Sequence, residues 1–350
     1  MLKLSEHIRF HAVQWAISLI FLVLILGFMA LAPRTFLHSR IYIAYLSTIP
    51  FAGMIALAMT LVIITGEMDL SFPAVMAACG FAFSKVFIMT GSPALGMGAA
   101  ILTGALAGGL NSLLVVGFGV PAIIATIGTQ FFWRGATVLL ADGLAVNMAE
   151  IRETAFHHVM VGRWFGVLPA QAVWFALLMV LLWLMLNRHI FGDHLRFCGD
   201  NADAARMMGI PVAGVRTGVF VLMGMVTGLS GAMVCMEMAS WWPTQGEGYM
   251  LLVFAAVFVG GTSVFGGKGT LYGTLVGSII IGMIEAGIIS IGLSGLWTRM
   301  VYGVVIMGAV SIHALLINPG SRSKRIKPDN PAVTGRFSAT GASPFLNPRL

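Results

Sequence analysis

The stretch NRHIFGDHLRFCGDNADAARMMGIPVAGVR, residues 187–216, is a long hydrophilic segment between two apolar segments. It contains four arginines, two histidines and three aspartates. Loops this basic beside membrane spans stay on the cytoplasmic side of the membrane. The stretch therefore predicts a cytoplasmic loop, and this loop sets the topology of the remaining chain.

The middle of this loop, residues 201–208, predicts a short helix. Either Asp200 or Asn201 can cap its first turn, and the sequence GIP at residues 209–211 ends it. A short capped helix at the membrane face can dock onto a soluble partner. A solvated connector without a docking role is the alternative.

The composition excludes a soluble globular protein. Of the 350 residues, 58% are hydrophobic and 9% are charged, whereas a soluble domain carries about 25% charged residues. We therefore expect an all-α, polytopic integral membrane protein embedded in a lipid bilayer. The net charge of +7 arises mainly from the termini and the 187–216 loop, which indicates positive-inside topology and not a nucleic-acid partner.

No enzymatic or metal-binding pattern is present in the sequence. Cys79, Cys198 and Cys235 form no C-x-x-C motif and lie beside no histidine cluster, so neither a disulfide framework nor a metal site is expected. The motifs G-x-S-x-G and H-E-x-x-H are absent. The chain is therefore not expected to be an enzyme.

The apolar runs predict about ten transmembrane helices, because about 20 helical residues cross a bilayer. The eighth run has about 12 residues, or roughly 18 Å of helix, and predicts a half-helix. The first run is expected to be retained and not cleaved as a signal peptide. The ten runs are residues 15–32, 43–64, 72–89, 93–116, 122–140, 170–186, 217–238, 249–260, 271–291 and 296–317.

Alternating ten spans from a cytoplasmic N-terminus places the basic clusters on one side. That side holds the 187–216 loop, Lys268, Lys3, Arg9 and a basic C-terminal tail, whereas the loop at residues 141–169 falls on the other. Both termini are therefore expected to be cytoplasmic. Residues 1–317 form the predicted transmembrane domain, and residues 318–350, rich in Pro, Gly and Ser, predict a disordered cytoplasmic tail.

The chain divides into five spans before residue 160 and five after it, which predicts an inverted 5+5 repeat. GEMDLSFPAVMAACG at residues 66–80 begins the third span, and GEGYMLLVFAAVFVGG at 246–261 begins the eighth, its positional partner. Inverted repeats place transport sites at their interface, beside broken helices. Chance similarity between apolar segments is the alternative explanation.

Glycines recur at small-xxx-small spacing, which lets helix backbones approach closely in lipid. They occur as Gly104 with Gly108, Gly224 with Gly228, and the series at residues 269, 273 and 277. The run GGTSVFGGKGT at residues 260–270 fails the G-x-x-x-x-G-K-[ST] pattern of a phosphate-binding loop, because glycine follows its lysine. If this protein uses ATP, another chain must bind it.

Polar residues within or beside the spans are expected to line a water-filled route, to pair, or to reach the surface, because burying them in lipid is unfavourable. Glu67 and Asp69 can alternatively cap a helix, and Lys85 and Arg134 are expected to extend to the membrane surface. The residues predicted to line a translocation pathway are Glu67, Asp69, Asn111, Gln130, Glu237 and Glu285.

Four motifs in this order resemble the ribose/xylose/arabinose-type permease family of ABC sugar importers. They are TGEMDLSFPAVMAACG (65–80), GVPAIIATIGT (119–129), FGDHLRFCGDNADAARMMGI (191–210) and VFVGGTSVFGGKGTLYGTLVGSIIIG (257–282). The resemblance covers nearly the whole chain up to residue 317. Glu285 departs from it, because such permeases often have a neutral residue there.

The resemblance implies a permease subunit that imports a monosaccharide or related polyol through the bacterial cytoplasmic membrane. It implies three protein partners: a second permease chain, a cytoplasmic ABC ATPase that uses ATP, and a periplasmic or lipid-anchored sugar-binding protein. This chain itself is expected to bind no cofactor. An ion-coupled secondary transporter of a small polar solute is the alternative. The residues implied to couple to the ATPase are Asp200, Asn201, Ala204, Ala205, Arg206 and Gly209.

Overall fold

The computed structural model describes residues 12–317, so the predicted tail at 318–350 and the basic residues Lys3 and Arg9 lie outside the described residues. Within the described range the chain is almost entirely helical, and its four strands have two residues each. The longer helices are α2 (Ala12–Leu31), α4 (Ser39–Ile64), α5 (Phe72–Thr90), α6 (Pro93–Ser112), α7 (Ala122–Leu140), α9 (Ala170–Arg188), α10 (Ile190–Asp200), α12 (Val212–Met238), α13 (Tyr249–Val259), α14 (Leu271–Ser290) and α15 (Trp297–Ile317).

Short elements connect these helices. The π-helical turn η1 (Leu113–Gly117) continues α6, and β1 (Val146–Asn147) pairs antiparallel with β4 (Ser240–Trp241). The strands β2 (Arg163–Trp164) and β3 (Leu168–Pro169) form a hairpin. The remaining short helices are α3 (Pro33–Phe36), η2 (Ala149–Glu153), α8 (Ala155–Met160) and α11 (Ala202–Met207).

Each of the ten predicted spans corresponds to a helix, which confirms the all-α polytopic fold. Eight helices in the described part of the chain are long and apolar enough to cross a membrane. The helix α13 has 11 residues, in agreement with the predicted half-helix, and α15 has 21. The sequence did not predict α10, which occupies the first half of the 187–216 loop.

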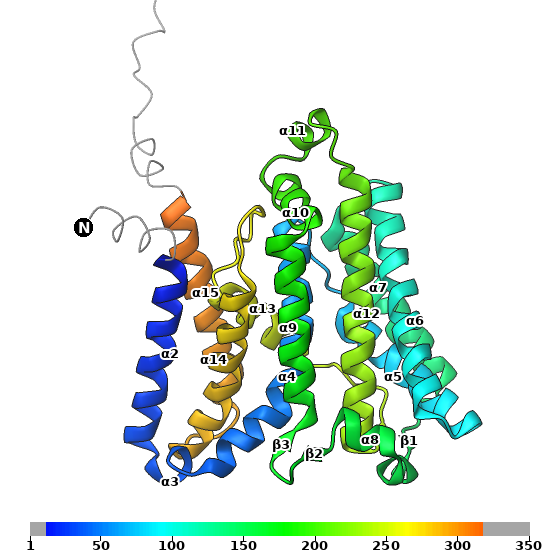
Figure 1. The fold of residues 1–350 in the computed structure, drawn as a ribbon, viewed down its shortest axis with the longest axis vertical. Helices are drawn as coiled ribbons and strands as arrows, with labels where there is room; N and C mark the ends of the chain where they lie inside the picture. Colours follow the sequence, from blue (N-terminus) through cyan, green and yellow to red (C-terminus); the bar gives the residue numbers. More distant parts are fainter. Residues whose placement is uncertain (1–11, 318–350) are drawn as a thin grey trace, which may run out of the picture.

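The two ends of the bundle carry different elements (Figure 1). The start of α2 and the end of α15 lie at the same end as α11, whereas α3, α8 and the strand pairs lie at the opposite end. This arrangement agrees with an even number of spans. It places the 187–216 loop and the loop at residues 141–169 on opposite faces.

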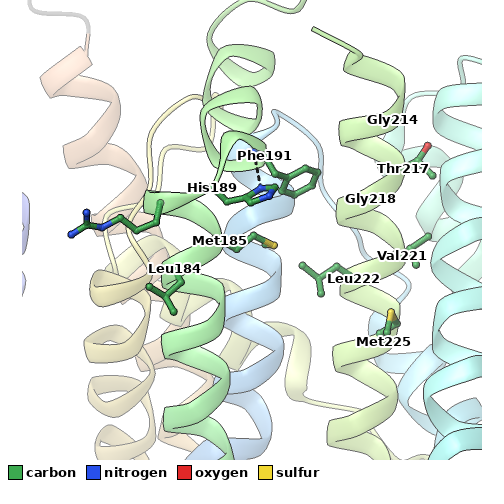
Figure 2. Close-up of a pocket in the computed structure, with 11 residues that line it drawn as sticks. Leu184, Met185, His189, Phe191, Gly214, Thr217, Gly218, Val221, Leu222 and Met225 are labelled. Atoms are coloured by element: carbon green, nitrogen blue, oxygen red, sulfur yellow. Dashed lines mark hydrogen bonds between the residues drawn. The ribbon is translucent and has the colours of Figure 1, made fainter.

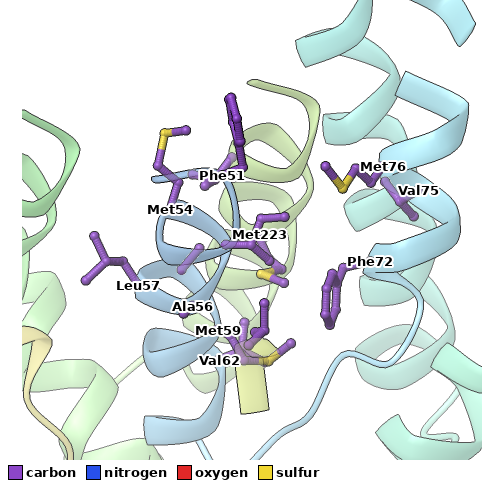
Figure 3. Packing of buried hydrophobic residues seen from close by; sticks show 14 of the residues in the cluster. Phe51, Met54, Ala56, Leu57, Met59, Val62, Phe72, Val75, Met76 and Met223 are labelled. Atoms are coloured by element: carbon purple, nitrogen blue, oxygen red, sulfur yellow. The ribbon is translucent and has the colours of Figure 1, made fainter. Parts of the chain in front are cut away.

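The helix α4 forms the centre of the core. Every residue from Gly53 to Thr65 is buried, and 83% of its apolar span is buried inside the protein. A helix that is apolar on all sides has to be surrounded by other helices. Figure 3 shows Met54, Met59 and Val62 of this cluster together with Phe72 of α5 and Met223 of α12.

The predicted glycine spacing brings α6 and α12 into backbone contact. A Cβ atom added to Gly104 would overlap the carbonyl oxygen of Gly224, and one added to Gly108 would overlap that of Phe220. A Cβ atom on Gly228 would lie 2.5 Å from the carbonyl oxygen of Ala100. Because lipid supplies little hydrophobic drive for helices to associate, such close packing is the main attraction between them.

We expect Gly104→Ala to destabilise the protein by about 1–3 kcal/mol, because the added methyl group overpacks the α6–α12 contact. Gly109 lies on the same helix, and its Cβ position is open within 4 Å. Gly109→Ala is therefore the matched control and should keep or slightly raise the unfolding temperature. Thermal unfolding in detergent compares the two variants, and equal unfolding temperatures would contradict this packing argument.

Two helices begin part-way through the bundle after irregular segments. Residues 65–71 connect α4 to α5, and residues 242–248 connect β4 to α13 (Figure 1). The two GE-containing sequences that suggested an inverted repeat fall at these two breaks. The repeat itself stays a prediction.

Candidate functional site

The tip of the 187–216 loop is the short helix α11. The Asn201 side chain caps it by accepting hydrogen bonds from the backbone N–H groups of Asp203 (3.1 Å) and Ala204 (3.0 Å). This geometry identifies Asn201, and not Asp200, as the N-cap residue. Gly209 ends the tip with φ = 82°, a left-handed conformation that favours glycine.

The faces of α11 divide into a buried side and an exposed side. Ala205 is 1% exposed and packs α11 onto the bundle of its own chain, whereas Ala204 is half-buried. Arg206 is exposed and forms an ion pair with Asp203 at 2.7 Å. Met207 and Met208, which sequence reasoning did not select, are 84% and 61% exposed. The outward surface of the tip is therefore more apolar than the sequence implied.

A glycine junction, formed by Gly199, Gly266 and Gly267, links this loop to two other segments. The Gly267 N–H donates to the carbonyl oxygen of Ile64, the last residue of α4, at 2.9 Å. A Cβ atom on Gly199 would overlap that same carbonyl oxygen. A Cβ atom on Gly267 would overlap the Asp200 carboxylate, so Asp200 faces this junction. Two of the four family-like motifs and the end of α4 thus meet at one point.

A buried polar network holds the first irregular segment at residues 65–71. Oδ1 of Asp69, which is 2% exposed, accepts hydrogen bonds from the Ser71 backbone N–H (2.8 Å) and hydroxyl (2.6 Å). Asn111 donates to both carboxylate oxygens at 3.3 Å, and Thr129 donates to the Asn111 carbonyl oxygen at 2.6 Å. The structure therefore brings together two predicted pathway residues, Asp69 and Asn111. Asp69 does not cap α5, because it accepts from Ser71, the residue before the helix, and not from a backbone N–H of its first turn.

The third predicted residue of this region, Glu67, forms an ion pair. Its carboxylate lies 3.0 Å from the guanidinium of Arg216 at the start of α12. Burial raises the pKa of the Glu67 carboxyl group, and the positive charge of Arg216 lowers it in part. Arg216 is one of four arginines in the basic 187–216 loop, so its charge did not distinguish it as the partner of Glu67.

Arg134 of α7 holds the second irregular segment at residues 242–248. Its guanidinium donates to the carbonyl oxygens of Pro243, Gln245 (3.1 Å) and Pro73 (3.2 Å). The expectation that Arg134 extends to the membrane surface is therefore wrong, because its guanidinium donates hydrogen bonds to three carbonyl groups inside the protein. Gln245, which is 1% exposed, adds a hydrogen bond to the Gly231 carbonyl oxygen at 2.9 Å.

The other predicted pathway residues lie apart from these contacts. Glu237 of α12 accepts a hydrogen bond from Gln171 of α9 at 3.3 Å. Gln130 follows Thr129 on α7 and is half-buried, and Glu285 is exposed on α14 beside a small cavity. The structure thus separates the predicted set into several sites.

A larger apolar groove lies between α9 and α12 at the α11 end, with a volume of about 940 Å³ (Figure 2). Met185, Leu222 and Met225 line it, and His189 and Phe191 border it. His189 Nδ1 accepts a hydrogen bond from the Phe191 backbone N–H at 3.1 Å. Its apolar lining offers few contacts to a polar solute.

Among residues 12–317, no group of three or more His, Cys, Asp or Glu side chains is placed to hold a metal ion. The described features are instead interrupted helices, internal polar networks and a projecting loop. Together with the long apolar helices, they define a multi-pass membrane protein. The chain belongs to the permease family described as branched-chain amino acid transport system / permease component, whose model matches residues 41–310.

Three relatives show which proteins this chain resembles. The ribose import permease of Bacillus subtilis is 34% identical over 79% of this chain and 85% of its own length. The L-arabinose ABC transporter permease of Azospirillum brasilense is 30% identical over 88% of both chains. The fructose import permease of Rhizobium meliloti is 29% identical over 86% of both chains. These relatives confirm the resemblance to sugar ABC permeases. No solved structure matches the chain significantly.

We expect Arg134→Met to lower the free energy of unfolding by at least about 2 kcal/mol, because it leaves buried carbonyl groups without a charged donor. The matched control is Lys85→Met, since Lys85 is an exposed span cation whose ammonium lies 5.4 Å from the Phe81 ring centroid. Chemical unfolding in detergent measures both variants. Similar losses in the two variants would contradict the role assigned to Arg134.

Proposed function

We propose that this chain is the membrane permease subunit of an ATP-binding cassette importer for a monosaccharide or related polyol. The similarity to ribose, L-arabinose and fructose import permeases, which extends over about four fifths or more of the chain, carries this proposal. The proposed location is the bacterial cytoplasmic membrane, with the α11 end in the cytoplasm because the 187–216 loop is basic.

The proposed complex contains a second permease chain, a cytoplasmic ATPase that binds the ATP and a periplasmic or lipid-anchored sugar-binding protein. The α11 tip is the proposed contact with the ATPase. Within the predicted coupling set, Arg206 and half-buried Ala204 face outward, Asn201 and Gly209 shape the tip, and Asp200 lies at the glycine junction. Met207 and Met208 supply exposed apolar area, which binding interfaces favour.

The glycine junction supports a route by which movement of α11 reaches the membrane helices. Gly199 and Asp200 end α10 directly before the tip, and Gly267 donates to the end of α4. The next segment along the chain is the irregular stretch at 65–71. A displacement of α11 driven by the ATPase would therefore act on the segment that Asp69 and Glu67 hold.

The alternative is an ion-coupled secondary transporter that uses Glu67, Asp69 or Glu237 to bind a cation. The described contacts give each carboxylate a partner: Arg216 for Glu67, Ser71 and Asn111 for Asp69, and Gln171 for Glu237. This arrangement favours structural roles for the three groups.

Affinity purification of the tagged chain from native membranes tests the two functions. Recovery of an ATPase subunit is expected, whereas recovery of the chain alone, with uptake that survives ATP depletion, would refute the importer.

We expect the double variant Met207→Glu, Met208→Glu to lower recovery of the ATPase at least about tenfold. The reason is that each substitution buries an uncompensated carboxylate in the interface. Met89, 81% exposed at the opposite end of the bundle, supplies the control variant Met89→Glu. Quantitative affinity purification measures the ratio of the two chains. Ala205→Glu is unsuitable, because Ala205 is buried within its own chain. Unchanged recovery with the double variant would remove α11 from the interface.

A further inference from the structure

The groove between α9 and α12 is an open apolar surface within the membrane-spanning length of the bundle (Figure 2). Both helices pack against α4, and about 940 Å³ remains between them at the α11 end. Leu184, Leu222 and Met225 belong to its lining. The hydroxyl of Thr217, a polar residue of the lining, lies 2.7 Å from that of Ser112 and is therefore paired. A hydrocarbon chain is the occupant that such a surface suits.

Two hydrogen-bond donors lie at the α11 end of this apolar lining. Arg188 is the last residue of α9, and His189 follows it; both line the groove and both are exposed. Among residues 12–317, Arg188 forms no ion pair, so its guanidinium is available to a ligand. Because His189 Nδ1 accepts the Phe191 N–H, the neutral imidazole carries its proton on Nε2 and donates from there. The groove is therefore amphipathic, with a cation at one end.

The basic end lies where the headgroups of a lipid bilayer are expected. The apolar span of α9 ends at Arg188, and the hydrophilic 187–216 loop begins there. Arginine side chains at the ends of membrane helices extend to the interface, where the lipid phosphates lie. Basic pockets between membrane helices bind anionic headgroups. A phospholipid matches both halves of the groove, whereas a soluble anion would leave the apolar half empty.

The aromatic ring of Phe191 joins α10 to α12 at this end of the groove. A Cβ atom on Gly218 of α12 would lie 3.2 Å from Cζ of Phe191, so the glycine lets the ring pack directly on the helix (Figure 2). The groove is thus bordered by α9, α10 and α12, which flank the α11 tip in the chain. An occupant would contact the elements on both sides of that tip.

We propose that the groove between α9 and α12 is a binding site for an anionic phospholipid. An acyl chain lies against Leu222 and Met225, and the phosphate group accepts hydrogen bonds from Arg188 and His189. The charge of Arg188 selects an anionic headgroup over a zwitterionic one. The bound lipid holds the end of α9 and the start of α12 together, on either side of the α11 tip. The site goes beyond the proposed transport function and does not depend on which solute is transported.

Native mass spectrometry of the full-length chain tests the headgroup contact. The probes are palmitoyl-oleoyl phosphatidylglycerol and the phosphatidylcholine with the same chains. We expect the first phosphatidylglycerol to bind at least about fivefold more tightly, the contribution of one basic residue near a lipid surface. Arg188→Gln should remove this preference and leave the affinity for phosphatidylcholine unchanged. The control is Arg40→Gln, because Arg40 is exposed near the start of α4 at the opposite end. Equal affinities for the two lipids, or equal losses in the two variants, would overturn the assignment.

Filling the groove tests the acyl-chain contact. Met225 is 39% exposed, so Met225→Trp places an indole in the groove without disturbing the core. We expect it to lower the affinity for both lipids at least about threefold, because the ring occupies the space of the chain. The control is Leu106→Trp, since Leu106 is 63% exposed on α6, away from the groove. Equal affinities in the two variants would overturn the contact.

Two further outcomes would assign the groove to another occupant and overturn the proposal. Displacement of phosphatidylglycerol by glycerophosphoglycerol, its headgroup without acyl chains, would identify a site for a soluble phosphate. Conversion of a dimer to a monomer by Met225→Trp would identify a contact between two copies of the chain. All these measurements use the permease chain alone, so they are independent of whether an ATPase co-purifies with it.

Discussion

The structure depends on one constraint: a polar group within the membrane has to find its partner in the protein, because lipid offers none. Continuous helices meet this constraint automatically, but the breaks before α5 and α13 do not. Asp69 accepts the Ser71 backbone N–H at the first break, and the Arg134 guanidinium donates to the Gln245 carbonyl group of the second break and to that of Pro73 in the first turn of α5. The polar side chains of this protein therefore serve first to permit irregular backbone inside the bundle.

Close backbone approach is the second element of the fold. Gly104 and Gly224 let α6 and α12 touch, and Gly199 and Gly267 let the 187–216 loop touch the end of α4. The first contact builds the bundle, and the second joins its projecting tip to the helices. In both cases glycine has no side chain to keep the neighbouring segment away. The same property therefore packs the spans and forms the contact through which we propose that movement reaches α4.

The pathway residues illustrate how far sequence reasoning reaches. A scarce polar residue in an apolar run is recognisable, and Asp69, Asn111 and Glu237 were recognised in this way. The pairs that they form were not, because Gln171 lies 66 positions from Glu237 and Asn111 lies 42 from Asp69.

The sequence by itself determined the all-α membrane fold, the ten helical segments, the short α13 and the permease family, because hydrophobic length and local motifs are properties of contiguous residues. It also located the α11 tip and its end at Gly209. Only the tertiary structure decided that Ala205 faces inward while Met207 and Met208 face outward, that Arg216 pairs with Glu67, and that Arg134 binds carbonyl groups. These facts depend on which distant segments meet, and helix packing sets those meetings.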